Sequence, residues 1–155
     1  MLEKYNIDSF KKDLEELNIS LDKRQMCQFL QYYELLVEWN SFMNLTAITD
    51  YDEVIKKHFI DSLSLIKAID LSDEIKVIDI GTGAGFPGIP LKIAFPNLKV
   101  TLLDSLNKRI KFLNEVIDKL ELKDIIAIHG RAEDFAKDKN YRQSYDLCVS
   151  RAVAN

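Results

Sequence analysis

The sequence predicts an α/β protein in which a parallel sheet follows an N-terminal helical extension. Apolar residues recur at helical spacing through residues 1–70, whereas four short apolar stretches typical of strands follow Leu71. Strands that alternate with amphipathic helices pair in parallel. With 155 residues and 47% hydrophobic content, the chain can form one domain with a buried core. We therefore divide it into a helical extension, 1–70, and a sheet domain, 71–155.

Three helices are expected in the extension. The first spans Asp8 to Leu17, with apolar residues at helical spacing, and the second runs from its N-cap Asp22 to Met43. The expected apolar face of this second helix consists of Met26, Phe29, Leu30, Tyr33, Leu36, Val37 and Phe42. After the non-helical NLTAITD, the third helix covers 50–69. Its expected apolar residues are Val54, Ile55, Phe59, Ile60, Leu63 and Ile66.

The second half of the chain has the pattern of βαβ units. The stretches expected to form strands are KVIDI (76–80), NLKVTLLD (97–104), DIIAIH (124–129) and SYDLCVS (144–150). Helices are expected at GIPLKIAF and NKRIKFLNEVIDKLEL, between the first three strands. Pro90 is tolerated in the first turn of a helix, and Pro96 ends it.

Charge and composition argue against several classes of function. The formal net charge of −4 disfavours a chain that grips nucleic acid through a global positive field. Cys27 and Cys148 lack metal-ligand or redox spacing and are interpreted as buried reduced thiols. His58 and His129 also lack partners at such spacing, so no metal site is proposed. No apolar run approaches the roughly 20 residues of a membrane span, and the charged N-terminal segment is unlike a signal peptide. We expect a cytoplasmic monomer.

The stretch VIDIGTGAGFPGIP admits two interpretations. Its Gly83-x-Gly85-x-x-Gly88 matches the dinucleotide fingerprint of nicotinamide-dependent oxidoreductases. Its Asp79 followed by Gly81-x-Gly83-x-Gly85 matches the loop of nucleoside-binding methyltransferases. In both interpretations glycines are needed because residues without a Cβ let a nucleoside lie against the backbone. A tight turn without any ligand is the third alternative.

Two features of this stretch favour S-adenosylmethionine over NAD. The strand ends in Asp79, whose carboxylate can accept backbone amides of the turn and suits a cationic sulfonium better than an anionic pyrophosphate. Phe86 and Pro87 then occupy the place where phosphate-binding amides would need open access. The methyl donor has no phosphate, so nothing is lost there.

Other candidate residues follow the remaining strands. In an open α/β sheet, ligands bind outside the carboxyl ends of the strands. Asp104 ends the second strand, where an acidic side chain can accept hydrogen bonds from both ribose hydroxyls or simply cap the next helix. Ala132 and Glu133 follow the third strand and can either form an adenine slot or be solvated. Arg151 follows the fourth strand, where it can bind the cofactor or an anionic substrate.

The stretches NLTAI, KHFIDSL, DIGTGAGFPGIPL, LLDSLNKRIKFL, GRAE and SRAVA occur in this order. Together they resemble the bacterial RsmG (GidB) family, which methylates a guanine at N7 in the 16S ribosomal RNA of the small subunit. The resemblance covers almost the whole chain from Asn44 and implies a Rossmann-like, class I S-adenosylmethionine-dependent methyltransferase fold. The cofactor-binding residues that it implies are Gly81, Gly83, Gly85 and Phe86 in the loop, Asp104, Ser105 and Leu106 at the ribose, Ala132 and Glu133 at the adenine, and Arg151 at the cofactor or target base.

The chain departs from the family at its end. It stops just after SRAVA, so strands one to four of the expected sheet are present, with the fourth beside the first and at the edge. We interpret the chain as a C-terminally truncated piece of the family's domain, whose own catalytic activity stays open.

The resemblance also implies a simple reaction. Guanine N7 carries an in-plane lone pair and needs no deprotonation, so no catalytic acid or base is nominated, and catalysis would come from proximity and orientation. The target base must be unstacked, and Phe86 either stacks on it or packs under the loop. Two basic clusters are either solvated helix faces or contacts to RNA phosphates: Lys56, Lys57 and His58, and Lys108, Arg109 and Lys111. An oxidoreductase that binds NAD and a nucleoside-binding module without catalysis are the alternatives.

Overall fold

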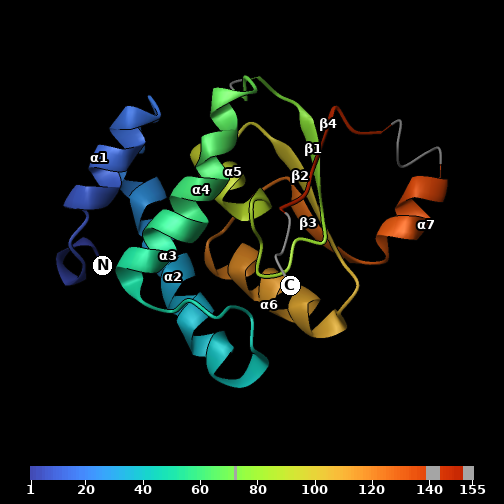
Figure 1. The fold of residues 1–155 in the computed structure, drawn as a ribbon, viewed down its shortest axis with the longest axis horizontal. Helices are drawn as coiled ribbons and strands as arrows, with labels where there is room; N and C mark the ends of the chain where they lie inside the picture. Colours follow the sequence, from blue (N-terminus) through green and yellow to red (C-terminus); the bar gives the residue numbers. More distant parts are fainter. Residues whose placement is uncertain (72, 139–143, 152–155) are drawn as a thin grey trace.

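The computed structural model describes residues 1–71, 73–138 and 144–151, and its strands form a parallel sheet (Figure 1). The strands are β1 (Lys76–Ile80), β2 (Lys99–Asp104), β3 (Ile125–His129) and β4 (Leu147–Val149), in the order β3-β2-β1-β4. Ile78 of β1 lies opposite Thr101 of β2 on one side and opposite Cys148 of β4 on the other. The α/β fold and the place of the fourth strand beside the first are confirmed.

Three helices connect the strands: α5 (Gly88–Ala94), α6 (Asn107–Lys119) and α7 (Ala132–Lys137). Right-handed crossovers place α5 and α6 on one face of the sheet and α7 on the other. Figure 1 shows α7 on the far side of the sheet from the N-terminal helices. The sequence predicted α5 and α6 but not α7, because a helix of 6 residues is too short to show an apolar repeat.

The N-terminal part begins with η1 (Leu2–Lys4), α1 (Asp8–Glu16) and α2 (Lys23–Met43). The Asp22 carboxylate accepts the backbone N–H of Gln25 at 2.8 Å, and the Gln25 side chain accepts the N–H of Asp22 at 2.8 Å. This reciprocal capping satisfies two backbone donors that the first turn of a helix leaves unpaired. The predicted helices and the predicted N-cap Asp22 are confirmed.

The predicted apolar face of α2 was partly wrong. Tyr32 and Leu35 are buried, whereas Val37 and Phe42 are 37% and 64% exposed and Tyr33 is only half-buried. Val37 and Phe42 lie toward the C-terminal end of α2, which projects away from the sheet in Figure 1. The middle of α2 packs instead against the glycine-rich loop, which turns Tyr32 inward.

The third helical region is continuous, as predicted, but irregular. It consists of α3 (Tyr51–Val54), the π-helical η2 (Ile55–Ile60), α4 (Asp61–Leu63) and the 3₁₀-helical η3 (Ser64–Lys67). Ile60 and Ile66 are only partly buried, but two polar residues, His58 and Ser62, are buried. His58 and Ser62 follow Val54 at intervals of four residues, so they lie on the same buried face of the region.

A cluster of aromatic side chains joins the N-terminal helices to the sheet. Phe29 lies 5.1 Å from Phe59 between ring centroids, Tyr32 lies 5.3 Å from Phe59, and Tyr32 lies 5.6 Å from Phe86. These rings belong to one buried core that also contains Leu71 and the strands, so the core runs across residue 70, where we divided the sequence. The glycine-rich loop thus rests on the helical extension.

Both cysteines depart from the expectation of burial. Cys27 is half-buried, and Cys148 is exposed because β4 lies at the edge of the described sheet. Within the described residues, no helix is long and apolar enough to cross a membrane, and no group of three or more metal-ligating side chains forms.

Two glycines of the loop should respond differently to alanine. A Cβ at Gly85, whose φ is +101°, would lie 2.5 Å from Ile89 Cδ1 and 2.7 Å from Tyr32 Oη, whereas a Cβ at Gly83, with φ of +60°, meets nothing within 4 Å. Both substitutions carry the cost of a left-handed backbone, about 1–2 kcal/mol, but only Gly85→Ala adds overpacking of about 1–3 kcal/mol. Urea unfolding should therefore rank Gly85→Ala as the less stable variant. Equal stabilities would contradict the packing of Gly85 against α2.

Candidate functional site

The predicted site residues meet at the carboxyl ends of the four strands. Gly81 follows β1, Asp104 ends β2, Arg131 comes shortly after β3, and Arg151 comes shortly after β4. This edge is where open α/β sheets bind ligands. The sheet order therefore brings together segments that lie far apart in the sequence.

Five backbone amides of the glycine-rich loop, those of Thr82, Gly83, Gly85, Phe86 and Gly88, are bonded within the protein itself. Asp79 and Asp104 accept the N–H groups of Gly88 and Gly83 at 2.9 and 2.8 Å. The remaining acceptors are backbone carbonyls: Leu103 O for Thr82 N, at 3.0 Å, and Thr82 O for Gly85 N and Phe86 N, at 3.0 and 3.1 Å. Pro87 has no N–H. In a dinucleotide site these amides would face the pyrophosphate, so this loop is built for a ligand without phosphate at that place.

Asp79 supports the loop from below. It is fully buried, and its Oδ2 accepts the Thr82 hydroxyl at 2.6 Å as well as Gly88 N–H. Its Oδ1 has no hydrogen-bond partner among the described residues. Burial raises the pKa of Asp79 to about 7, although the Thr82 and Gly88 hydrogen bonds oppose the rise. The predicted contact to a turn amide is confirmed, but Asp79 does not line either of the two pockets described next.

Two pockets open on the two sides of Gly81. The Asp104 pocket, of about 420 Å³, is lined by Gly81, Leu103, Asp104, Ser105, Leu106, Gly130, Arg131, Ala132 and Glu133. The Arg151 pocket, of about 580 Å³, is lined by Asn44, Leu45, Thr46, Ala47, Ile48, His58, Gly81, Thr82, Gly83, Ala84, Phe86, Arg109 and Arg151. Nine of the ten residues predicted for cofactor binding line one of them. The tenth, Gly85, lies in neither and faces Tyr32 and Ile89 instead.

Asp104 lines one pocket and is bonded to Gly83 and Arg109, which line the other. It is 2% exposed, and it accepts Gly83 N–H at Oδ2 and Leu106 N–H at Oδ1, at 2.8 and 3.0 Å. Arg109 Nη1 donates to Oδ1 and Oδ2 at 3.5 and 3.4 Å. A carboxylate offers about four acceptor positions, so ligand hydroxyls would take the place of these long Arg109 contacts. Asp104 is thus both an anchor of the loop and a candidate acceptor.

Phe86 packs under the loop and is not free to stack on a target base. It is 4% exposed, and its ring is stacked on His58 at 4.4 Å and 9°. The Arg151 guanidinium carbon lies 4.9 Å from the same ring centroid. Of the two roles left open for Phe86, the structure supports packing, because tertiary neighbours already cover the ring.

Ala132 and Glu133 lie at the start of α7, not in an extended loop, and both are exposed. Both line the Asp104 pocket, and their role at the adenine stays a prediction, while the helix itself was not predicted.

The two basic clusters separate into different environments. His58 is 7% exposed and cannot meet RNA phosphates. Arg109 lines the Arg151 pocket and forms an ion pair with Asp104. Lys56, Lys108 and Lys111 are exposed. Residues that are neighbours in the sequence therefore do not all lie on one basic surface, and only the exposed lysines can contact RNA phosphates.

Sequence reasoning missed Tyr32 and Thr46, and it placed His58 in a basic cluster instead of in the site. The Tyr32 hydroxyl donates to the carbonyl of Ala84 in the loop. Thr46 and His58 line the Arg151 pocket and are hydrogen-bonded to each other. They belong to NLTAI and KHFIDSL, two of the stretches that carried the resemblance.

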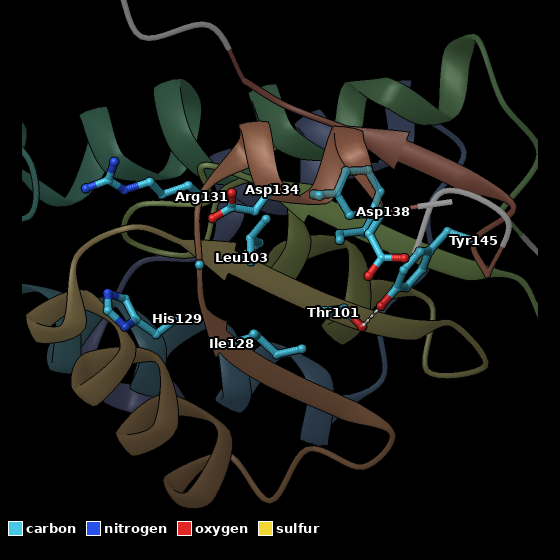
Figure 2. A pocket seen from close by; sticks show the side chains of 11 residues that line it. Thr101, Leu103, Ile128, His129, Arg131, Asp134, Asp138 and Tyr145 are labelled. Atoms are coloured by element: carbon cyan, nitrogen blue, oxygen red, sulfur yellow. Dashed lines mark hydrogen bonds between the residues drawn. The ribbon is translucent and has the colours of Figure 1, made fainter. Parts of the chain in front are cut away.

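A third pocket lies beneath α7 (Figure 2). Its volume is about 260 Å³, and Figure 2 shows Thr101, Leu103 and Ile128 projecting from the sheet into it. The Tyr145 hydroxyl donates to Thr101 Oγ1 at 2.9 Å across this space. None of the predicted cofactor residues lines this pocket.

The family model described as GidB, rRNA small subunit methyltransferase G, matches residues 25–155. The chain belongs to this family. Relatives named ribosomal RNA small subunit methyltransferase G are 62% identical over 146 residues in Lachnoclostridium phytofermentans and 59% identical over 140 residues in Thermoanaerobacter sp.. The matches cover 94% and 90% of this chain but 60% and 58% of those relatives, so the chain spans about three-fifths of their length. Family membership decides against the oxidoreductase interpretation.

Solved structures agree on the fold. A putative protein-L-isoaspartate O-methyltransferase from Plasmodium falciparum, in complex with S-adenosyl-L-homocysteine, is 16% identical with a TM-score of 0.57, covering 97% of this chain and 75% of that one. A putative S-adenosyl-L-methionine-dependent methyltransferase from Methanococcus maripaludis is 23% identical with a TM-score of 0.53, covering 77% and 48%. The predicted class I methyltransferase fold is confirmed.

The raised pKa of Asp79 predicts a pH-dependent stability. With a folded pKa of about 7 against an ordinary 3.8, the native state binds a proton that the unfolded chain releases between these values. The resulting stabilisation is complete below the unfolded pKa and is lost as pH rises through about 7. The free energy of unfolding of the wild type, relative to Asp79→Asn, should therefore fall between about pH 4 and pH 8 in urea titrations. The titration of His58 occurs in both proteins, so its contribution cancels in the comparison. A difference in the free energy of unfolding that does not change with pH would contradict the raised pKa of Asp79.

Proposed function

We propose that the protein containing this chain transfers a methyl group from S-adenosylmethionine to guanine N7 in the 16S ribosomal RNA of the small ribosomal subunit. One observation carries the proposal: five amides of the loop are already bonded within the protein, while Gly81, which lines both pockets, and Gly83 have room for a ligand because a Cβ there would meet nothing within 4 Å. This arrangement suits an uncharged nucleoside lying against the backbone. Membership of the rRNA small subunit methyltransferase G family supports the same reaction.

The two pockets divide the cofactor between them in this proposal. The Asp104 pocket takes the nucleoside half, with the Asp104 carboxylate accepting the ribose hydroxyls and Ser105 and Leu106 beside them. Ala132 and Glu133 lie at the adenine end of the same pocket. The methionine half passes Gly81 and Gly83 into the Arg151 pocket, which Phe86 supports from below.

The reaction requires the protein mainly to align guanine N7 with the methyl group of the cofactor. S-adenosylmethionine supplies an electrophilic methyl group on its sulfonium sulfur. Guanine N7 attacks with a lone pair that needs no deprotonation, so the residues of the Arg151 pocket have to orient the base and exclude water. The segment Asn44–Ile48 lines this pocket and is the wall for the incoming base in our proposal.

The partner is proposed to be ribosomal RNA within the assembled small subunit. A net charge of −4 disfavours tight binding to free RNA, whereas exposed Lys56, Lys108 and Lys111 can meet phosphates of a folded surface. The proposal treats the protein as a cytoplasmic monomer. A nucleoside-binding module without catalysis is the competing function, because the chain spans only part of its relatives.

Asp104 provides a test of cofactor binding. Asp104→Ala should weaken S-adenosylmethionine binding in calorimetry by about 1.5–3 kcal/mol, the usual size for a hydrogen bond to a charged group, since it removes the ribose acceptor and releases Gly83. Asp118→Ala, an exposed acidic residue on α6, is the matched control and should bind normally. Unchanged affinity in a folded Asp104→Ala protein would leave Asp104 as a structural anchor alone.

Transfer itself is tested with a form of the protein as long as its curated relatives. Incubated with labelled methyl donor and undermethylated small subunits, it should place label on N7 of a guanine in 16S ribosomal RNA, as mapped on the isolated RNA. Label on an exocyclic amine or a ribose would refute the proposed chemistry. Cofactor binding without any transfer would favour the binding module.

A further inference from the structure

His58 joins three parts of the chain at the Arg151 pocket. Its ring is 7% exposed and is stacked on Phe86 at 4.4 Å. Nε2 lies 2.8 Å from Thr46 Oγ1, and Nδ1 lies 2.9 Å from Arg151 Nη2. Both ring nitrogens are therefore engaged, one with the segment before the third helical region and the other with the end of β4.

The partners determine where the imidazole proton sits. An arginine side chain can only donate hydrogen bonds, so Nδ1 of His58 must be the acceptor and carries no proton. The ring proton is then on Nε2 and is donated to Thr46 Oγ1. Burial, followed by the nearby positive charge of Arg151, lowers the pKa of His58 to about 4, which agrees with a neutral ring.

Thr46 extends this connection into the pocket wall. Its Oγ1 also accepts the backbone N–H of Ile48 at 3.1 Å, and its own N–H is donated to Asn40 Oδ1 of α2 at 2.8 Å. The segment Asn44–Ile48 lines the same pocket as the glycine loop. The position of this wall is thus tied to the Nε2 side of His58.

Arg151 is held on the other side of the ring. Besides Nδ1 of His58, its guanidinium donates to the carbonyl of Lys57 at 3.3 Å and lies 3.7 Å from Asp61 Oδ2. The contact with His58 is the shortest of these, and the same guanidinium lies over Phe86. A long side chain at a strand end has many rotamers, so these fixed acceptors select the one that lines the pocket.

We propose that His58 is a positioning residue: its neutral ring, protonated at Nε2, holds Arg151 and the Asn44–Ile48 wall in the arrangement that forms the base-binding side of the site. This inference rests on the proposed function for the meaning of that site. His58 does not act as a base, since Arg151 occupies its lone pair and N7 attack needs no proton acceptor. It acts on the reaction only through Arg151 and Thr46.

The kinetic test uses the form as long as the curated relatives and compares two replacements of His58. His58→Phe keeps a ring on Phe86 but offers Arg151 no acceptor, and it should lower kcat/KM for methyl transfer by about tenfold or more. His58→Asn places an amide oxygen near the position of Nδ1, so it restores the acceptor for Arg151 but not the donor to Thr46, and it should recover most of the loss but not all of it. If His58→Phe fails to fold, His58→Gln, whose amide reaches the Nε2 position but not Nδ1, takes its place with the same expected loss.

A double-mutant cycle distinguishes positioning from general stability. In an Arg151→Ala background, His58→Phe should lower kcat/KM by a clearly smaller factor than in the wild type, because only the contact to Thr46 is left to lose. Losses that multiply independently would overturn the inference. If Arg151→Ala alone leaves transfer unchanged, the proposed role of Arg151 in the site fails, and with it the functional meaning of His58.

A spectroscopic measurement tests the tautomer without any activity. The chain contains 2 histidines, so His129→Gln assigns the ¹⁵N signals of His58 directly. At neutral pH the spectrum should show a protonated Nε2 and an unprotonated Nδ1, and Arg151→Ala should shift the Nδ1 signal. A ring protonated at Nδ1, or doubly protonated, would contradict the positioning geometry even if methyl transfer to N7 is observed.

Discussion

Two buried carboxylates at the ends of adjacent strands hold the glycine-rich loop through hydrogen bonds, and the rest of the site depends on these bonds. Asp79 at the end of β1 binds Thr82 and Gly88, and Asp104 at the end of β2 binds Gly83. The parallel register places Asp79 and Asp104 at the same edge of the sheet, where the strands end. The loop is therefore bonded to the ends of two neighbouring strands. Five of its amides are satisfied within the protein, which suits a ligand that fits against the backbone without a phosphate.

Burying the Asp79 side chain beneath the loop has an electrostatic cost. Asp79 is buried with one oxygen unpartnered among the described residues, and burial raises its pKa to about 7. A hydrophobic residue there would leave the amide of Gly88 and the hydroxyl of Thr82 without their acceptor, and buried unpaired donors are costly. Asp79 therefore both fixes the loop geometry and spares two buried donors the cost of being unpaired.

The N-terminal helices complete the site and are not merely attached to it. Tyr32 of α2 bonds the loop carbonyl of Ala84, and His58 of η2 packs on Phe86 and bonds Arg151. The aromatic cluster through Phe59 makes both contacts part of one core. A change in the packing of the helical region is thus transmitted directly to the Arg151 pocket.

The sequence by itself determined the strands, the main helices, the Asp22 cap and the positions of the loop and Asp104, because each depends on a local pattern of apolar, glycine or acidic residues. It also carried the family resemblance. Only the tertiary structure decided that Gly85 packs on Tyr32, that Phe86 is covered, and that Thr46, His58 and Arg151 form one hydrogen-bonded group. These contacts join residues from separate segments, and no periodicity along a chain encodes which side chains will meet once the strands are ordered and the helices are packed.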